Sequence, residues 1–330
     1  DKSGVAALVE FGVRLAGRNN KLSARFGEIA TLIREADYWG GRMGKKVLDR
    51  EVVHRAIQEK ENRLGLPEER LQEYFTDGTL FLETTGTAVG QVNGLSYLGT
   101  EDFAFGKPMR ITAQTALGRA GLINIEREAE MSGPTFNKAM LIIEGWFRAL
   151  FGREYPISLS ASICFEQSYG GVEGDSASVA ELCALLSSLA GVPLRQDLAV
   201  TGSINQHGEV QPIGGVNEKI EGFFDVCRSR ELSGAQGAVI PRANVNDLML
   251  RLDVVEAVRA GRFAVHAVSR VEEAIELLTG LPAGARDAEG RFPADSVFGR
   301  VDAVLRGYAQ RMRDFTRGSD PARDDGGESA

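Results

Sequence analysis

The hydrophobic periodicity of this chain changes near residues 63–75, and the change separates two kinds of structure. Before it, apolar residues recur at intervals of three and four, which is typical of one face of a helix. Asp49 precedes one of these runs, where its carboxylate can accept a hydrogen bond from the first helical turn. Residues 1–65 are therefore predicted to form a bundle of three or four helices. The predicted apolar stripe includes Ala7, Leu8, Phe11, Leu15, Phe26, Ile29, Leu32 and Ile33.

Beyond Gly65 the apolar residues occur in short, strand-like segments that are separated by glycines. Residues 66–280 are therefore predicted to form a domain of mixed sheets and helices, after a short helix that begins at Pro67. Its first four strands are expected to make a small antiparallel region. Together with the helical bundle, this domain gives the fold class α+β. The predicted strands are 79–84, 90–95, 110–117, 121–128, 157–165, 198–202, 237–241 and 263–268, and the predicted helices are 137–151, 176–189, 214–227 and 271–278.

Residues 281–330 are predicted to comprise a polar linker, an amphipathic helix and a polar tail. The apolar residues of this helix form one stripe, which is expected to dock on another protein surface, in this chain or outside it. The last dozen residues have too little apolar content to order themselves. The stripe comprises Val297, Phe298, Val301, Val304, Leu305, Tyr308 and Met312.

The charge balance argues against nucleic acid as the primary partner. The chain of 330 residues has a net charge of -8 and a pI near 5.2. Proteins that bind a phosphate backbone usually carry a surplus of Lys and Arg instead. The hydrophobic share of 43% and the charged share of 25% are ordinary globular values, so neither a disordered chain nor a fibrous repeat is indicated.

Cysteine spacing and hydropathy indicate a reducing compartment, and we expect a cytoplasmic protein. The three cysteines show no C-x-x-C spacing, so we expect neither a disulfide framework nor a metal site. The longest nearly apolar stretch, residues 139–151, contains Glu144 and Arg148 and is shorter than the roughly 18 residues that a membrane span needs. No membrane span is therefore predicted. The chain begins at Asp1 without an initiator Met, which suggests a segment of a longer polypeptide.

Ser176 follows a glycine-rich loop and stands at the predicted start of a helix. The loop reads Glu173-Gly174-Asp175-Ser176-Ala177-Ser178 and follows the predicted strand 157–165. Backbone N–H groups in a first helical turn have no partner within the helix, so they can stabilise a negatively charged oxygen. A nucleophilic serine would find its oxyanion site there. A serine at this position is also a common helix N-cap, and local features leave both interpretations open.

A nucleophilic serine needs a base, and none of the three histidines is well placed to be one. His54 lies in the helical bundle, His207 in a predicted turn between strands, and His266 within a predicted strand. Lys219 is the remaining candidate. It adjoins the apolar stripe of its predicted helix, where burial would lower the pKa of its ammonium group to about 7 to 8. A neutral amine can accept a serine proton, whereas a lysine on an exposed helix face is simply solvated.

Several separated motifs resemble the peptidase domain of Lon proteases, over roughly residues 70–280. The sequence Gly174-Asp175-Ser176-Ala177 is followed forty-three residues after Ser176 by Lys219, within Pro212-Ile213-Gly214-Gly215-Val216-Asn217-Glu218-Lys219. Val192-Pro193, residues 199–202, Ile240-Pro241, Asn244, Asp247-Leu248 and residues 266–268 match the family as well. Motifs in the right order and spacing are far more specific together than any one of them alone.

The resemblance implies that Ser176 is the nucleophile, Lys219 the general base and Thr201 a hydroxyl that orients the lysine amine. The backbone N–H groups of Ser176 and a neighbour, Asp175 or Gly174, are expected to hold the oxyanion. The form Glu-Gly-Asp-Ser-Ala-Ser resembles the B-type Lon branch and its bacterial relatives. Many A-type enzymes carry histidines on the strand before the loop, where this chain has Ser162 and Cys164.

The N-terminal helices resemble the small lid subdomain of an AAA+ ATPase, which precedes the peptidase domain in Lon. Arg25 is then a candidate sensor arginine near a nucleotide phosphate. No cofactor is expected within this chain, and ATP with Mg²⁺ is expected in an ATPase core that precedes Asp1. The resemblance further implies a homo-hexameric ring that degrades unfolded polypeptides. The alternatives are a catalytically inactive Lon-like scaffold attached to an ATPase, and a hydrolase that uses His207 or His266 as its base.

Overall fold

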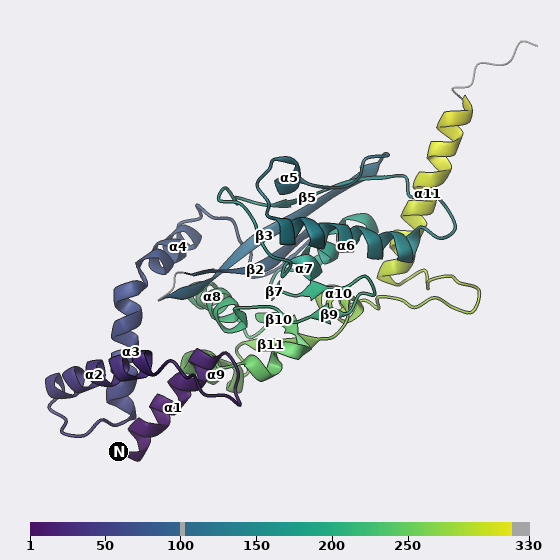
Figure 1. The fold of residues 1–330 in the computed structure, drawn as a ribbon. Helices are drawn as coiled ribbons and strands as arrows, with labels where there is room; N and C mark the ends of the chain where they lie inside the picture. Colours follow the sequence, from purple (N-terminus) through teal and green to yellow (C-terminus); the bar gives the residue numbers. More distant parts are fainter. Residues whose placement is uncertain (100–102, 319–330) are drawn as a thin grey trace, which may run out of the picture.

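The computed structural model describes residues 1–99 and 103–318, and it confirms an α+β architecture (Figure 1). Four helices come first: α1 (Lys2–Ala16), α2 (Phe26–Arg42), α3 (Arg50–Leu64) and α4 (Leu66–Thr76). Asp49 caps α3 as predicted, because its carboxylate accepts a hydrogen bond from Val52 N at 3.0 Å. The first three helices share a small apolar core, which contains Ala7, Leu32, Ala36, Val52, Val53 and Ala56.

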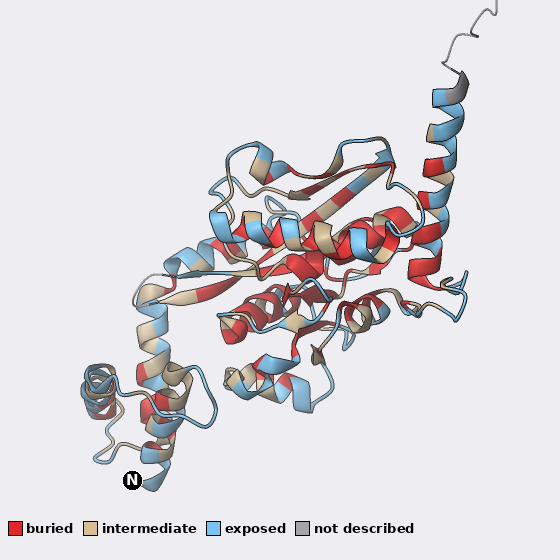
Figure 2. Cartoon of the chain, turned by 45° about the vertical axis from the view of Figure 1, so that its right-hand side comes forward, coloured by how far each residue is buried: buried red, intermediate tan, exposed pale blue. Residues whose placement is uncertain are grey.

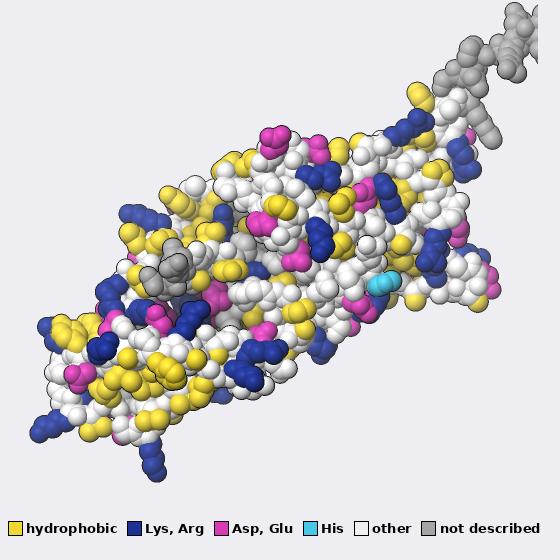
Figure 3. Space-filling model, in the orientation of Figure 1, with side chains coloured by type: hydrophobic (Ala, Val, Ile, Leu, Met, Phe, Trp, Pro, Cys, Tyr) yellow, Lys and Arg dark blue, Asp and Glu magenta, His cyan; other side chains and the backbone are white. Residues whose placement is uncertain are grey.

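The predicted apolar stripe of the N-terminal helices is only partly buried. Phe26 was expected on the packed face, but its side chain is 75% exposed at the first turn of α2. Figure 3 shows hydrophobic side chains gathered over the end of the molecule formed by α1 to α3. A bundle of three short helices has too small an interior to bury every apolar residue of its sequence. The exposed residues at this end include Val5, Val9, Leu22, Phe26, Ile33 and Tyr38.

A seven-stranded mixed sheet forms the centre of the molecule, in the order β11-β10-β7-β2-β3-β5-β4. The antiparallel pairs are β2 with β3 and β3 with β5, whereas the remaining neighbours pair in parallel. Two small two-stranded sheets, β1-β6 and β8-β9, lie beside it. The strands of the central sheet are β2 (Gln91–Gly99), β3 (Ala104–Leu117), β4 (Gly121–Asn124), β5 (Leu159–Phe165), β7 (Leu198–Val200), β10 (Gly237–Pro241) and β11 (Ala264–Val268); the others are β1 (Thr87–Ala88), β6 (Leu194–Arg195), β8 (Ser203–Ile204) and β9 (Val210–Gln211).

The prediction of a small antiparallel region was right for the pairing of β2 with β3 and wrong in three respects. The hairpin of β2 and β3 is part of the large sheet, because β2 pairs in parallel with β7 on its other side. Residues 125–128 form the short helix α5 (Ile125–Glu128), which Asn124 caps by accepting from Arg127 N. Residues 79–84 form no strand, because side chains bind their backbone groups: Asn93 Nδ2 donates to Glu83 O, and Phe81 N donates to Gln167 Oε1.

Helices cover both faces of the central sheet, and neighbouring strand residues point into different cores. Val200 and Val239 pack with α6 (Pro134–Phe151), α7 (Ser178–Ala190), α10 (Val271–Thr279) and α11 (Val297–Gly318). Ala199 and Ala238 pack instead with α4, α8 (Val216–Ser229) and α9 (Leu252–Arg259). Figure 2 shows the buried residues concentrated in the central helices and strands. The 3₁₀ helix η1 (Arg242–Asp247) follows β10 and precedes α9.

The final helix, α11 (Val297–Gly318), docks on α7 through its predicted apolar stripe. Val297, Phe298, Val301 and Leu305 are fully buried, and Trp146 of α6 meets the Phe298 ring edge-on. The far half of α11 projects from the sheet domain at the end opposite α1 (Figure 1). The predicted polar tail, residues 319–330, lies outside the described residues. Among the helices of the described ranges, none is both long enough and apolar enough to span a bilayer.

Candidate active site

Ser176 lies in the loop between β5 and α7, two residues before the helix begins. The predicted helix start at Ser176 was therefore wrong, because α7 begins at Ser178 and Ala177 occupies its N-cap position. The Ser178 hydroxyl donates to Asp175 O at 2.6 Å, and Ser178 N donates to the same oxygen at 3.2 Å. These two bonds turn the chain before α7. The Ser176 side chain makes no cap bond to the helix and is free for another role.

The loop that carries Ser176 is anchored on both sides. Gly174 has a φ of +90°, which a residue with a side chain rarely adopts. Asp175 Oδ2 accepts from the Ser203 hydroxyl of β8 at 2.7 Å, and Glu173 Oε1 accepts from Thr135 N at the start of α6. Ser176 O accepts from Gly202 N at 2.7 Å. The nucleophile candidate is thereby fixed relative to the carboxyl end of β7.

Lys219 lies in the first turn of α8, which Gly215 opens with a φ of +67°. Its backbone N–H donates to Gly215 O at 3.0 Å, and the residue is only 2% exposed. A Cβ atom at position 215 would come within 2.7 Å of the Tyr97 ring, so only glycine fits this approach of α8 to β2. The helix therefore delivers a buried lysine to the end of the sheet.

The structure brings Ser176, Lys219 and Thr201 together, although α7 and α8 pack on opposite faces of the sheet. Lys219 Nζ donates to Ser176 Oγ at 2.8 Å and to Thr201 Oγ1 at 3.2 Å. The Thr201 hydroxyl in turn donates to Ser176 O at 3.1 Å. Thr201 directly follows β7, so the three side chains meet at the carboxyl end of that strand, where α/β sheets commonly place ligand sites.

Burial lowers the pKa of the Lys219 ammonium group to about 8, because a desolvated charge is disfavoured. The nearby Asp175 carboxylate opposes this shift, since a negative charge favours the protonated amine. A lysine with this pKa is partly neutral near pH 7, unlike an ordinary surface lysine. The amine can therefore exchange a proton with the hydroxyl that it contacts.

Two backbone N–H donors, those of Asp175 and Ser176, lie close in sequence to the Ser176 hydroxyl. Within the described residues, neither Asp175 N–H nor Ser176 N–H has a hydrogen-bond partner. The N–H groups at the start of α7 lie next in sequence, at the positive end of the helix dipole. Such donors can hold a developing negative charge on a carbonyl oxygen.

None of the histidines is hydrogen-bonded to the candidate nucleophile. The partner of Ser176 Oγ in the described part of the chain is Lys219 Nζ. His207 is exposed in the turn between β8 and β9, as predicted, where its N–H donates to Asn205 Oδ1. His266 lies within β11, and burial lowers its pKa.

Two family models match this chain. Residues 1–63 match the AAA+ ATPase LID domain of archaeal LonB, and residues 162–280 match the C-terminal proteolytic domain of Lon protease (S16). The chain belongs to the Lon protease family. Its N-terminal helices are hence a lid domain, and the domain that carries Ser176 and Lys219 is a Lon proteolytic domain.

Named Lon relatives extend the match beyond these two models. A protein of Escherichia coli named "Putative Lon protease homolog" is 44% identical over 243 residues, which are 73% of this chain and 41% of that protein. A protein of the same name from Haemophilus influenzae is 41% identical over 227 residues, which are 68% of this chain and 38% of that protein. The Archaeal Lon protease of Archaeoglobus fulgidus is 31% identical over 281 residues, 84% of this chain and 42% of that protein. The chain thus spans less than half of the length of these Lon relatives.

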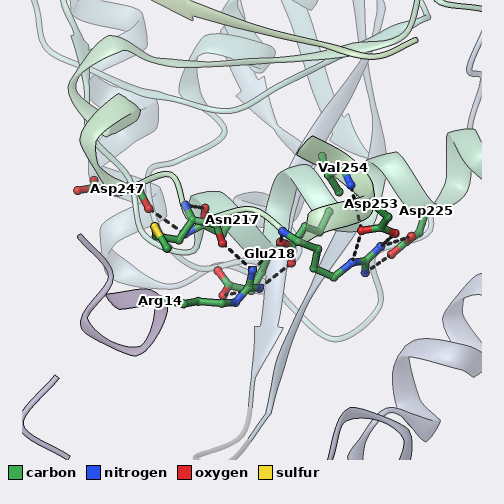
Figure 4. A network of polar contacts seen from close by, with 10 residues as sticks. Arg14, Asn217, Glu218, Asp225, Asp247, Asp253 and Val254 are labelled. Carbon is green, nitrogen blue, oxygen red and sulfur yellow. Dashed lines mark hydrogen bonds and ion pairs between the residues drawn. The ribbon is translucent and has the colours of Figure 1, made fainter. Parts of the chain in front are cut away.

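Several polar residues near the dyad candidates stand in the family motifs, but their contacts were not predicted from the sequence. Asn217 and Glu218 directly precede Lys219 in α8, and Figure 4 shows both in a network that also contains Arg14 of the lid domain. Asn217 Oδ1 accepts from Met249 N, and its amide donates to Asp247 O. Polar residues on a helix usually indicate a solvated face, so the motif did not predict these contacts.

Arg25, the predicted sensor arginine, is exposed directly before α2. Its side chain makes no hydrogen bond or ion pair within the part of the chain that the structure describes. One exposed guanidinium does not by itself form a phosphate site. The sensor role of Arg25 therefore stays a prediction.

Proposed function

We propose that this chain is the lid and proteolytic part of a Lon-type serine endopeptidase that cleaves through a Ser176–Lys219 dyad. The observation that carries the proposal is the 2.8 Å contact between Lys219 Nζ and Ser176 Oγ, made by a lysine that is 2% exposed. A desolvated amine and a hydroxyl at this distance have the geometry of a general base and its nucleophile.

The proposed reaction begins with the neutral form of Lys219. Its amine accepts the Ser176 hydroxyl proton while Ser176 Oγ attacks the peptide carbonyl carbon. The resulting ammonium returns that proton to the leaving amine as the peptide C–N bond breaks, which leaves an ester on Ser176. Water then attacks the ester, and Lys219 takes the water proton and passes it to Ser176 Oγ as the ester bond breaks. Thr201 keeps the amine aimed at Ser176 through its contact with Nζ.

The tetrahedral intermediates carry a negative charge on the former carbonyl oxygen. The unpartnered N–H groups of Ser176 and Asp175 support an oxyanion site at this position. Gly174 serves this site through its backbone conformation, because its φ of +90° sets the turn that leaves the Asp175 N–H free.

The proposed substrates are unfolded or damaged polypeptides, and the proposed assembly is a homo-hexamer in the cytoplasm. The family membership and the AAA+ lid support an attached ATPase core that binds ATP and Mg²⁺ outside these residues. The exposed apolar side chains over α1 to α3 support contacts with further protein, because contiguous apolar surface often marks an interface. No step of the proposed chemistry passes through ATP.

Degradation of casein by the full-length protein tests the proposal. We expect hydrolysis by the natural protein and its loss in Ser176→Ala, because the alanine has no hydroxyl to form the acyl-enzyme. Lys219→Gln should abolish hydrolysis as well, whereas His207→Ala and His266→Ala should retain it. The reverse result for lysine and histidine would identify a Ser-His hydrolase.

A catalytically inactive Lon-like scaffold is the second candidate function. Such a scaffold predicts equal casein hydrolysis, at background level, for the natural protein and for Ser176→Ala. The retained Ser176–Lys219 contact argues against it, because a structural domain gains nothing from a buried lysine whose charge is poorly compensated. Equal rates for the two proteins would overturn the protease proposal.

A further inference from the structure

Helix α8 contacts the lid domain on one side and Ser176 on another. Glu218, Glu221 and Asp225 recur at intervals of three and four, so they lie along one side of the helix. Figure 4 shows this side facing Arg14 of α1 and the segment around Asp253. Lys219 lies within the same stretch of helix and reaches Ser176. The lid and the candidate base are therefore connected through a single rigid element.

The main lid contact is a bidentate ion pair. Arg14 Nη1 and Nη2 donate to Glu221 Oε1 and Oε2, each at 2.6 Å, and Nη1 also donates to Met249 O at 2.8 Å. The Glu221 side chain is 7% exposed, and its Oε1 accepts a further bond from Arg251 N at 2.7 Å. A buried carboxylate that loses its guanidinium leaves an uncompensated charge, which strongly disfavours the arrangement.

A second connection runs through the segment 244–251, which is clamped onto α8. Asn217 binds this segment at two points, by donating to Asp247 O at 2.9 Å and by accepting from Met249 N at 2.7 Å. The lid reaches the same segment, because Asn19 N donates to Asn246 O at 2.9 Å. The lid thus contacts both α8 and the segment that holds α8.

The same segment also fixes the chain that leads into α8. Asn244 Oδ1 accepts from Ile213 N, and Asn244 Nδ2 donates to Ile213 O, both at 2.9 Å. Ile213 lies two residues before Gly215, which opens the helix. Lys219 is hence held from Ile213 and Asn217 on its N-terminal side and from Glu221 on its C-terminal side.

We propose that Arg14 is a positioning residue for Lys219: by pairing with Glu221, the lid holds α8 where the lysine amine meets Ser176. This inference rests on the proposed dyad, and it adds that the dyad needs the Arg14–Glu221 pair for its full rate. Proton transfer depends on a short distance between amine and hydroxyl, and a displacement of about 1 Å can cost about 100-fold in rate. Arg14 lies 207 residues from Glu221 in the chain and touches neither reacting group.

Labelling of Ser176 by a fluorophosphonate tests the inference in the full-length protein. In this reaction Ser176 Oγ forms a bond to phosphorus, fluoride leaves, and Lys219 takes the proton. We expect Arg14→Gln to slow labelling at least about 10-fold across a range from about pH 6 to pH 10. The midpoint of the pH profile should also move to higher pH, because a displaced Lys219 amine loses part of the burial that lowers its pKa to about 8. A merely structural role for Arg14 would not move this midpoint.

Arg50→Gln is the matched control. Arg50 forms an equally bidentate pair with Glu10 at 2.6 and 2.7 Å, but both residues belong to the lid, and within the described residues neither forms a hydrogen bond or ion pair with α8. This variant should label at the natural rate. A double variant with Arg14→Glu and Glu221→Arg restores the ion pair with its charges reversed. It should recover a large part of the labelling rate that Arg14→Gln loses.

The outcomes separate the inference from the proposed function. If the natural protein labels at Ser176 and Arg14→Gln labels equally fast with the same midpoint, the positioning role is wrong. If the natural protein shows no labelling at Ser176, the dyad itself is wrong. Circular dichroism establishes that each variant is folded. Should Arg14→Gln prove unfolded, Arg14→Lys decides instead: it keeps the charge but loses the bidentate geometry, so a slower rate supports the positioning role and an unchanged rate overturns it.

Discussion

Ser176 and Lys219 differ in their access to water, and the difference suits their proposed roles. Lys219 is 2% exposed, whereas Ser176 is half-buried and can be reached by a polypeptide. A dry environment disfavours the ammonium form, so the amine is available as a base near neutral pH. A substrate can therefore approach the Ser176 hydroxyl while the Lys219 amine stays shielded from water.

Thr201 is the residue whose removal tests how the amine is aimed. Thr201→Val keeps the shape of this fully buried side chain but removes the hydroxyl that contacts Lys219 Nζ and Ser176 O. A hydrogen bond to a charged group is worth about 1.5 to 3 kcal/mol, so we expect peptide hydrolysis to fall about 10- to 100-fold. Initial rates with a fluorogenic peptide measure the effect. Thr201→Ser, which keeps the hydroxyl, should retain most of the activity, and equal losses in both variants would contradict the role of the hydroxyl.

Sequence and structure agree best on the residues of the candidate site and least on what supports them. Ser176 and Lys219 were predicted from a loop, an apolar stripe and family motifs, but the distance between them depends on the packing of α7 and α8 on opposite sheet faces. Ser176 also proved to lie before the helix rather than at its start. Arg14 could not have been predicted, because its partner Glu221 is remote in sequence and arginine is common on helices.

At the scale of elements, the loop before α7 depends on one backbone conformation. Gly174→Ala should destabilise the protein by about 1 to 2 kcal/mol, because a φ of +90° is strained for any residue with a Cβ atom. Apart from residues 173–175, no heavy atom of the described residues lies within 4 Å of the added Cβ, so the loss arises from the backbone alone. We expect peptide hydrolysis to fall as the loop relaxes and moves Ser176. Urea denaturation and initial rates measure the two effects.

Gly44→Ala is the control for this loop prediction. Gly44 has a φ of +68° and equally open surroundings, but it follows α2 in the lid domain. The stability loss should be similar and the activity should be unchanged. Natural activity in folded Gly174→Ala would show that the loop conformation does not position the nucleophile.

Helix α11 stabilises the proteolytic domain through its buried first half. Phe298 is 1% exposed and meets the rings of Trp146, Phe151 and Phe292. Phe298→Ala should lower the free energy of unfolding by about 3 to 5 kcal/mol, since it leaves a cavity in a packed core. Phe26→Ala, at a side chain that is 75% exposed, should change it by less than about 0.5 kcal/mol. Guanidinium denaturation compares them, and equal effects would contradict the docking of α11.

For the whole molecule, the sequence predicted the kinds of element better than their pairing. The change from helical to strand-like periodicity near residue 65 gave the fold class, because each pattern depends only on close neighbours. The parallel pairing of β2 with β7 joins segments about a hundred residues apart, which no local pattern records. Residues 79–84 have the composition of a strand, but the side chains of Asn93 and Gln167 bind their backbone groups and no ladder forms.

The candidate site lies at the carboxyl end of β7, where helices from both faces of the sheet come together. Helix α7 covers one face and α8 the other, and their first turns converge at the end of β7, next to Thr201. The lid contacts α8 from outside the sheet domain (Figure 4). A single element therefore connects the outer surface of the molecule to its candidate base.

The pH dependence of acyl-enzyme formation tests most directly whether Lys219 is the base for Ser176. The measurement is the rate of the pre-steady-state burst with a peptide ester, recorded from about pH 6 to pH 10. Because burial lowers the pKa of Lys219 to about 8, the base is neutral above this pH and protonated below it. The rate should therefore rise with pH to a plateau with a midpoint near 8, and the burst should vanish in Lys219→Gln. A burst that persists in Lys219→Gln, or a midpoint near the ordinary histidine pKa of about 6.5 that His207→Ala or His266→Ala removes, would contradict the account.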